Sequence, residues 1–320
     1  MKISFVIPCY GSEHTIEQVV DEIRQTVATR PSFDYEIVLV SDCPPDNTFK
    51  VIRALAEQDA HITAVELAKN SGQPNAILAG LHVADGDYVC CGDDDGQTVF
   101  CETFRLLDEL GDDCDIVFGR YEERGRKSWF RDFGSNVNEW MLHTFLDKKK
   151  EWYMSSFFVM KKFVAQKMTE YPNPYPFIEG LVLRVTHRIK NVDVVERERF
   201  SGKSGYSFMK LISLWVNGFT AFSVKPLRMA SFCGFLIAAL GLGYGAFVVI
   251  RRLLEMPEEV SEGWASLAVL IAVVGGLILM VLGLLGEYIG RLYISINKSP
   301  QFVVRSIVKK ENVDVDEKTE

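Results

Sequence analysis

Three adjacent aspartates, Asp93, Asp94 and Asp95, follow one glycine after the apolar segment 87–91. Neighbouring carboxylates repel one another, and partly desolvated ones tend to take up protons unless a cation is present. Mg²⁺ and Mn²⁺ are hard cations that favour carboxylate and phosphate oxygens. The pattern therefore predicts a divalent cation that joins these carboxylates to an anionic ligand. A solvated acidic turn is the alternative when the aspartates are taken alone.

Apolar strands alternate with helical segments ahead of and around these aspartates. Strands are expected at 2–8, 36–40, 61–67, 87–91 and 115–119, and helices at 13–28, 47–58 and 72–84. Strands of nearly continuous apolar character separated by helices predict βαβ units and a parallel sheet covered on both faces. Ligands bind outside the carboxyl ends of such strands. The segments leaving those ends are polar or glycine-rich: PCYGSE, SDCPPDN, LAKNSGQPN and GDDDGQT.

Composition and missing motifs exclude several other functions. Neither GxGxxG nor GxxxxGK[ST] occurs, so the dinucleotide and P-loop interpretations lack their phosphate cradle. The net charge of −8 argues against nucleic acid as a partner. The seven cysteines form no CxxC pair and no cluster at metal spacing, which favours reduced thiols in the cytosol.

Two uncharged apolar stretches, 229–250 and 263–286, predict two transmembrane helices, since each exceeds the roughly 20 residues that a spanning helix needs. The basic residues flanking the pair place both ends in the cytoplasm: Lys225, Arg228, Arg291, Lys298 and Arg305. Residues 207–224 have apolar side chains at helical spacing, with the tryptophan and lysine typical of an interfacial helix. The N-terminus lacks the apolar region of a signal peptide, so we expect the preceding part to stay in the cytosol.

Four regions follow from these patterns: a cytosolic domain at 1–206, an amphipathic juxtamembrane region at 207–226, a transmembrane hairpin at 227–290 and a C-terminal segment at 291–320. The charged tail from Lys309 onward is expected to be disordered. Glycines at GxxxG spacing, Gly286 and Gly290, predict close helix packing, either within the hairpin or between subunits of a homo-oligomer.

The order of motifs resembles the family 2 glycosyltransferases with the GT-A fold. The motifs that carry the resemblance are VIPCYGSE, SDCPPDNT, KNSGQPNAILAG and DDDGQ. Downstream, GR…RKSWFR (119–131), RERFSGKSGYSFMKL (197–211), KPLRM (225–229) and LLGEYIGRLY (284–293) narrow it to polyprenyl-phosphate glycosyltransferases, including the undecaprenyl-phosphate aminoarabinose-type transferases. The resemblance implies an α/β fold: a Rossmann-like, mostly parallel catalytic domain followed by amphipathic interfacial helices and two transmembrane helices.

The resemblance also implies roles for residues at matching positions. Asp93 and Asp95 are the arms of an Asp-x-Asp element that binds Mg²⁺ or Mn²⁺, with Asp95 the main ligand, and Gln97 lies beside the sugar or acceptor. These three residues are the expected catalytic group. The nucleotide sugar is expected to contact Pro8, Tyr10, Glu13, Asp42, Asn70, Gly72, Gln73, Asp93 and Asp94. Tyr10 and Glu13 could instead simply start a helix, and Asp42 could be an ordinary turn residue.

A second set of residues is expected to bind the lipid phosphate, because arginine and lysine suit phosphate. The set comprises Arg120, Arg131, Arg199, Lys203, Ser204 and Tyr206. The alternative is a polybasic segment attracted to anionic membrane lipid.

Two departures from the family pattern affect the expected chemistry. The usual DGS after the second strand reads DCPPDN, so only Asp42 is retained and the choice between UDP and GDP stays open. Ser156 stands at or near the position of an aspartate that serves as base in many relatives. Either Glu151 or Glu179 supplies a base, or none is needed because a phosphate acceptor is mostly a dianion at pH 7, its second pKa being about 6.

We therefore expect an inner-membrane, multi-pass, inverting glycosyltransferase with its catalytic domain in the cytosol. It would move a sugar from a nucleotide-diphosphate donor, a UDP-sugar, to undecaprenyl phosphate for envelope glycan or lipopolysaccharide modification. One alternative is a transferase acting on a sugar hydroxyl of a lipid-linked glycan. Another is a non-catalytic membrane scaffold that binds nucleotide sugar.

Overall fold

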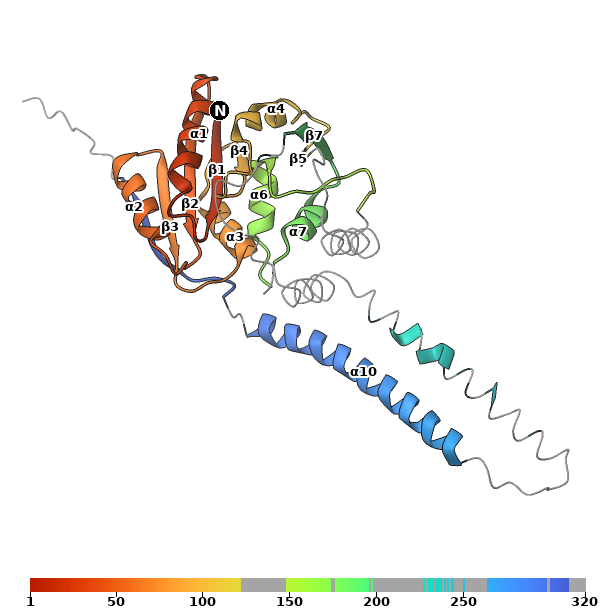
Figure 1. Ribbon diagram of the computed structural model, residues 1–320. Helices are drawn as coiled ribbons and strands as arrows, with labels where there is room; N and C mark the ends of the chain where they lie inside the picture. Colours follow the sequence, from red (N-terminus) through yellow and green to blue (C-terminus); the bar gives the residue numbers. More distant parts are fainter. Residues whose placement is uncertain are drawn as a thin grey trace, which may run out of the picture.

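The computed structural model describes residues 1–121, 148–173, 176–195, 197, 264–297 and 300–310, with scattered helical residues between 227 and 250 (Figure 1). Its strands are β1 (Lys2–Cys9), β2 (Asp34–Ser41), β3 (Ile62–Leu67), β4 (Tyr88–Cys91), β5 (Ile116–Tyr121), β6 (Phe158–Lys161), β7 (Ile189–Val194) and β8 (Val304–Lys309). Its helices are α1 (Ile16–Ala28), α2 (Thr48–Gln58), α3 (Gln73–Val83), a short 3-10 turn (Phe100–Glu102), α4 (Thr103–Asp108), α6 (Lys162–Thr169), α7 (Ile178–Val185) and α10 (Trp264–Ile296).

The described strands form one eight-stranded sheet in the order β7-β5-β6-β4-β1-β2-β3-β8. β1 lies between β2 and β4 and is parallel to both, and β2 is parallel to β3. The predicted strands and helices up to β5 are confirmed, with their ends within a few residues of the expected ones. The first four strands all present their carboxyl ends at one edge, as the βαβ pattern predicted.

Both faces of the sheet are buried by helices, which explains the nearly continuous apolar strands. Phe5 and Ile37 face a core shared with α1, α2 and α4. Val6 and Val38, one position further along the same strands, face a second core shared with α3, α6 and α7. Successive side chains of a strand point to opposite faces, so a strand buried on both faces needs apolar residues at every position.

Two strands run against the parallel direction, and sequence reasoning identified neither. β6 lies between β4 and β5 and is antiparallel to both. β8 is antiparallel to β3 at the other edge, although it lies in the segment 291–320 outside the predicted domain 1–206. The tail expected to be disordered from Lys309 thus begins at the last residue of a strand, and residues 311–320 lie outside the described part of the chain.

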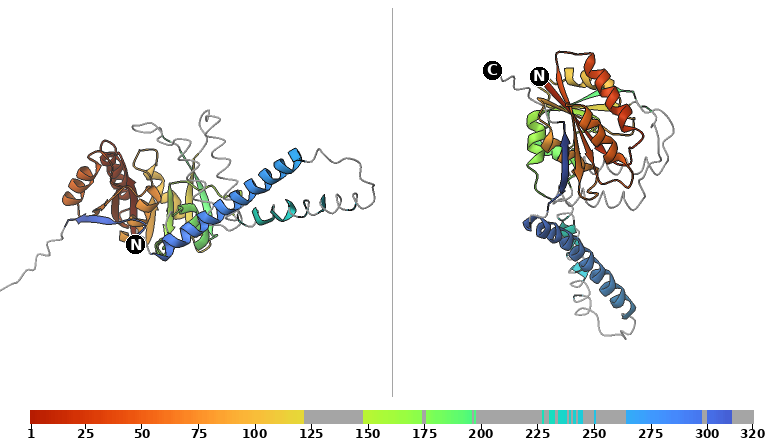
Figure 2. Two further views of the ribbon diagram at one scale, coloured as in Figure 1. Left: turned by 90° about the horizontal axis from the view of Figure 1, so that it is seen from below. Right: turned by 90° about the vertical axis from the view of Figure 1, so that its left-hand side faces the viewer.

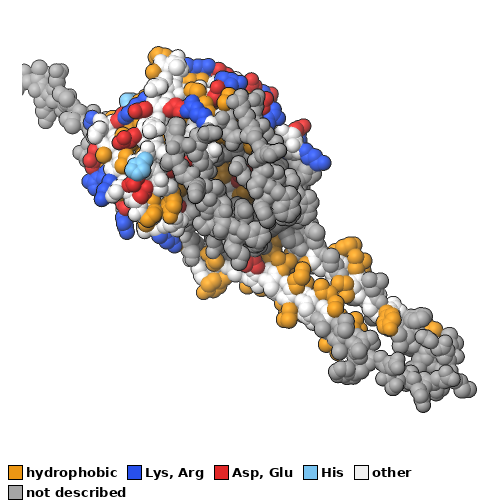
Figure 3. Space-filling view, viewed as in Figure 1, with side chains coloured by type: hydrophobic (Ala, Val, Ile, Leu, Met, Phe, Trp, Pro, Cys, Tyr) orange, Lys and Arg blue, Asp and Glu red, His pale blue; other side chains and the backbone are white. Residues whose placement is uncertain are grey.

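α10 is the long apolar helix of the described structure. It has 33 residues, and within the described residues it is the one helix long and apolar enough to span a membrane, over Val273–Ile296. Apolar side chains such as Leu279 and Ile289 are exposed along it (Figure 3). The predicted first span at 229–250 and the amphipathic region 207–226 fall mostly or wholly outside the described residues.

The chain returns from α10 directly to the sheet through a segment that we call the junction, residues 295–309. Gln301 donates two 2.6 Å hydrogen bonds from its amide nitrogen, to the carbonyls of Tyr171 and Asn173. β8 then begins opposite Leu67, the last residue of β3. The carboxyl edge of the sheet consequently faces the end of α10 (Figure 2).

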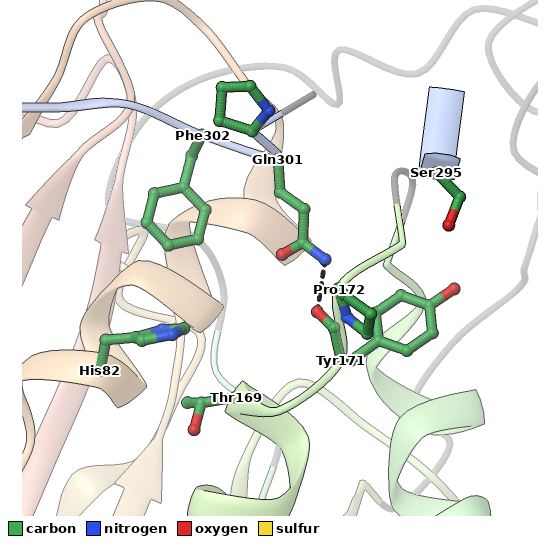
Figure 4. Close-up of a pocket in the computed structure, with 8 residues that line it drawn as sticks. His82, Thr169, Tyr171, Pro172, Ser295, Gln301 and Phe302 are labelled. Carbon is green, nitrogen blue, oxygen red and sulfur yellow. Dashed lines mark hydrogen bonds between the residues drawn. The ribbon is translucent and has the colours of Figure 1, made fainter. Parts of the chain in front are cut away.

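A cavity of about 420 Å³ lies at this junction (Figure 4). The residues that line it come from α3, the end of α6 and the segment after it, the end of α10 and the start of the return to β8: His82, Thr169, Tyr171, Pro172, Ser295, Pro300, Gln301 and Phe302. Within the described part of the chain, the lining holds no aspartate, glutamate, lysine or arginine and none of the predicted site residues. The cavity is therefore separate from the predicted site.

Candidate functional site

The three aspartates lie in a tight turn between β4 and the 3-10 turn. Gly96 has φ +82°, a left-handed conformation that favours glycine. The turn is closed by its own hydrogen bonds: the Asp93 N–H donates to Thr98 Oγ1 at 2.9 Å, and the Gln97 N–H donates to Asp95 Oδ1 at 3.0 Å. The loop that carries the carboxylates is therefore held in one shape before any ligand binds.

Asp93 receives side-chain hydrogen bonds from two other elements. Gln73, the first residue of α3, donates from Nε2 to Asp93 Oδ1 at 2.7 Å. Ser156, just ahead of β6, donates its hydroxyl to Asp93 Oδ2. The structure thus brings the predicted residues Asp93 and Gln73 together and adds Ser156 to them.

Asp94 fastens the first strand-end loop to the aspartate turn. Its Oδ2 accepts the Tyr10 N–H at 2.9 Å, and its backbone carbonyl accepts the Thr15 hydroxyl at 2.8 Å. Burial raises the pKa of Asp94 to about 6, although the Tyr10 N–H acts in the opposite direction. The Tyr10 ring is 54% exposed and extends from the loop that Asp94 holds.

Asp42, the residue retained from the family motif, is buried at the end of β2. Its two oxygens accept the backbone N–H groups of Ser71 (2.6 Å) and Gly72 (2.8 Å). Burial raises the pKa of Asp42, while these two N–H donors lower it. Asp42 therefore fixes the loop that carries Asn70, which is exposed, and Gly72, whose φ is +88°.

The first two strand-end loops are joined through Glu13. Its Oε2 accepts the Asn47 N–H at 2.9 Å, so Glu13 stabilises the start of α2. Pro8 is buried within β1, paired with Val40 of β2. The predicted nucleotide contacts thus divide into exposed groups at the edge and buried groups that hold the loops in place.

Cys43 follows Asp42 at the position where the family motif has glycine. Its φ is +50°, the left-handed region that glycine adopts readily and other residues avoid. Cys43 therefore holds a backbone conformation that glycine would adopt at lower cost.

The described part of the basic lipid-phosphate set is small. Gln97 Nε2 donates to the Arg197 carbonyl at 3.5 Å, and the Arg197 guanidinium pairs with Glu22 at 2.7 Å, so the RERF segment begins beside the aspartate turn. Arg120, at the end of β5, pairs with Asp193 of β7 at 2.6 Å. Arg131, Arg199, Lys203, Ser204 and Tyr206 lie outside the described residues.

The site's donor set fits a cation that is bound together with a phosphorylated ligand. Among the described residues there is no group of three or more His, Cys, Asp or Glu side chains that could hold a metal. Mg²⁺ typically takes one or two protein carboxylates plus substrate phosphates rather than an all-protein cage. Asp93 and Asp95 can supply the protein oxygens, and a diphosphate would supply the others.

Sequence reasoning missed the side chains that support the aspartate turn. Thr98 and Thr15 carry no signal beyond their place next to motif residues. Ser156 was noted only as the residue standing where a base was expected. The two carboxylates proposed in its place differ in setting: Glu151 is 71% exposed beside Lys149, and Glu179 lies in the first turn of α7.

Comparison with known proteins gives two family matches. The glycosyl transferase family 2 profile matches residues 4–169, and the GtrB C-terminal hairpin profile matches residues 225–292. An undecaprenyl-phosphate 4-deoxy-4-formamido-L-arabinose transferase of Proteus mirabilis is 30% identical over 99% of this chain and 97% of its own length. A prophage-derived bactoprenol glucosyl transferase of Shigella flexneri is also 30% identical, over 95% of this chain and 98% of its own length.

Solved structures give the same fold at lower identity. A glucosyl-3-phosphoglycerate synthase of Mycobacterium tuberculosis, crystallised with phosphoglyceric acid, has a TM-score of 0.51 and 18% identity. The match covers 69% of this chain and 80% of that one. This likeness concerns the fold of the catalytic domain.

Proposed function

This chain belongs to glycosyl transferase family 2, and we propose that it transfers a sugar from a UDP-sugar to undecaprenyl phosphate at a cytoplasmic membrane, with inversion at the sugar carbon. The product is a lipid-linked monosaccharide for envelope glycan or lipopolysaccharide modification. The observation that carries the proposal is the preformed aspartate turn at the carboxyl edge of the sheet, on the side that faces α10. The full-length relatives named for undecaprenyl-phosphate and bactoprenol transfer support it.

On the donor side, Asp95 and Asp93 would hold Mg²⁺ or Mn²⁺, with Asp95 as the main ligand. Bound there, the cation would supply positive charge to offset that of the leaving nucleoside diphosphate. The base and ribose lie over the loops carrying Tyr10, Asn70 and Gly72, which Asp94 and Asp42 hold in position. These loops are fixed by protein hydrogen bonds, so little ordering is left for the donor to drive.

On the acceptor side, a lipid phosphate oxygen attacks the anomeric carbon. The new bond joins that oxygen to the sugar, and the bond between the sugar and the diphosphate breaks. A phosphate monoester needs no proton removed at pH 7, because its second pKa is about 6. Ser156 fits this scheme, since its hydroxyl donates to Asp93 and it offers no base.

The acceptor phosphate requires positive charge, which we assign to Arg199, Lys203 and their neighbours Ser204 and Tyr206. Arg131 and Arg120 add a second basic loop, where Arg120 must exchange its pairing with Asp193 for the phosphate. Arginine and lysine give forked and compact phosphate contacts respectively. This segment begins at Arg197, next to Gln97, and therefore close to where the sugar is transferred.

The membrane arrangement completes the proposal. A first span at 229–250 pairs with α10 as a hairpin, and 207–226 lies at the membrane surface ahead of it. The profile match of a C-terminal hairpin over 225–292 supports this arrangement. Gly286 and Gly290 give α10 a face for close packing, either on the first span or on a second subunit.

An acceptor panel tests the proposed function. The full chain in lipid vesicles is incubated with a mixture of UDP-sugars and Mg²⁺ and one of three acceptors: undecaprenyl phosphate, undecaprenol, which has a hydroxyl in place of the phosphate, or a lipid-linked sugar. We expect mass spectrometry to show a glycosylated product with the phosphate alone. Transfer to a lipid-linked sugar but not to undecaprenyl phosphate would instead support the hydroxyl-acceptor alternative, and no turnover with any acceptor would support the scaffold.

A further inference from the structure

Asp93, in a half-buried turn, is held by three hydrogen bonds. Its N–H donates to Thr98, its Oδ1 accepts from Gln73 at 2.7 Å, and its Oδ2 accepts from Ser156. The two side-chain donors come from different parts of the chain, the start of α3 and the segment ahead of β6, and Ser156 is 63 residues away in sequence. Both donors are neutral, so they stabilise the carboxylate without competing with a cation.

The backbone beneath Ser156 is rigid. Phe157 is fully buried in the core under α1 and α4, and Phe158 is buried in the opposite core. Ser155 bonds through its hydroxyl to the carbonyl of Gly119 in β5, at 2.7 Å. Because side chains on both sides are anchored, the Ser156 hydroxyl has little freedom to move away from Asp93.

We propose that Ser156 and Gln73 form a clamp that orients the Asp93 carboxylate for the metal-bound diphosphate, and that Ser156 is a positioning residue in this reaction. The inference rests on the proposed function and adds a residue to it. One donor holds each oxygen, so together the two donors fix the orientation of the carboxylate group.

Each of the three carboxylates is held by donors from the protein. Asp94 accepts the Tyr10 N–H and Asp95 accepts the Gln97 N–H. Ser156 and Gln73 hold Asp93 in the same way.

The test measures metal binding separately from turnover. The full chain in nanodiscs is titrated with Mn²⁺, with and without UDP, and free Mn²⁺ is followed by electron paramagnetic resonance. Loss of a group that supports a metal ligand typically weakens metal affinity about 10- to 100-fold. We expect Ser156→Ala to weaken Mn²⁺ binding in the presence of UDP by about 10-fold, and Ser156→Thr, which keeps the hydroxyl, to restore it.

Ser306→Ala is the matched control, because it removes the same hydroxyl group from a serine that bonds to Glu66 rather than to Asp93; we expect wild-type Mn²⁺ affinity. Gln73→Ala removes the other half of the clamp from a different element and should weaken binding as Ser156→Ala does, even if the latter variant folds poorly. Mn²⁺ affinity unchanged in both Ser156→Ala and Gln73→Ala would overturn the clamp. Wild-type protein that binds no Mn²⁺ with UDP would overturn the metal role in the proposed function itself.

Discussion

The donor side and the membrane side of this protein are built in different ways. On the donor side, the loops after β1, β2, β3 and β4 bind one another through Asp42, Asp94 and Glu13. Every one of these contacts lies within the first hundred residues. At the junction, Ser295 and Gln301 bond to residues 122 to 130 positions earlier, and β8 closes the sheet against β3.

This difference separates two tasks: forming the nucleotide site, and fixing the catalytic domain relative to α10. The donor loops follow from consecutive βαβ units, so we expect the nucleotide half to form without the segments 207–296. The position of that half relative to α10 depends on a few long-range contacts at the junction. Truncating the chain before the spans would also delete β8, so point substitutions distinguish the two tasks more cleanly.

The largest effect is expected on the donor side. Asp95→Asn removes the main metal ligand while leaving a similar shape, and the charge stabilisation lost is worth several kcal/mol. We expect kcat/KM to fall by about 10³-fold or more, since each 1.36 kcal/mol is a factor of ten. The thermal unfolding midpoint should stay near wild type, because the residue lies in a surface turn. Activity that survives both this substitution and excess EDTA would contradict the metal site.

The next effect is expected on the acceptor side. Arg199→Ala removes a charged donor to the lipid phosphate and should lower kcat/KM by about 10²-fold. Arg188→Ala is the matched control, because Arg188 is an exposed arginine that bonds to the Asp112 carbonyl; kcat/KM should change little. The kcat/KM of Glu179→Gln should also stay near wild type if no base is required.

The pH dependence of turnover separates the two acceptor chemistries. If the nucleophile is a phosphate dianion, kcat/KM should fall as pH drops below about 6, through protonation of the acceptor. The same profile should persist in Glu179→Gln. A limb of the profile that disappears with Glu179 would identify an enzyme base and favour a hydroxyl acceptor.

An intermediate effect is expected at the junction. Gln301→Ala leaves the carbonyls of Tyr171 and Asn173 without this donor and loosens the link between α10 and the catalytic domain. We expect turnover of undecaprenyl phosphate in vesicles to fall several-fold, on the order of the roughly 1 kcal/mol that a typical hydrogen bond contributes. UDP binding should be unchanged. If turnover and UDP binding fell equally, the donor side and the junction would not be separable.

The smallest effect concerns backbone conformation at the donor edge. Cys43 holds φ +50°, which costs a non-glycine residue about 1–2 kcal/mol. Cys43→Gly relieves this cost but loses up to about 1 kcal/mol through the freedom of glycine in the unfolded chain. We expect a net gain between about 0 and 2 kcal/mol in unfolding free energy, and a loss for Cys43→Val, whose branched side chain tolerates this region poorly. Chemical denaturation measures both.

The amino-acid sequence by itself determined the donor half. The strands up to β5, their helices, and the placement of Asp42 and the three aspartates at one edge all follow from apolar periodicity and chain order. These features are local: a strand buried on both faces must be apolar throughout, and consecutive parallel strands must end at the same edge. The three aspartates therefore had to meet the other strand-end loops.

Only the tertiary structure decided the partners that lie far apart in sequence. No periodicity indicates that Ser156 reaches Asp93, that β6 inserts antiparallel between β4 and β5, or that residues 304–309 add a strand beside β3. β8 is a half-exposed edge strand with arginine and lysine among its residues, so its composition resembles a solvated tail. Strand pairing depends on which edge is available and on the register that buries the right face, and both are properties of the assembled sheet rather than of the segment.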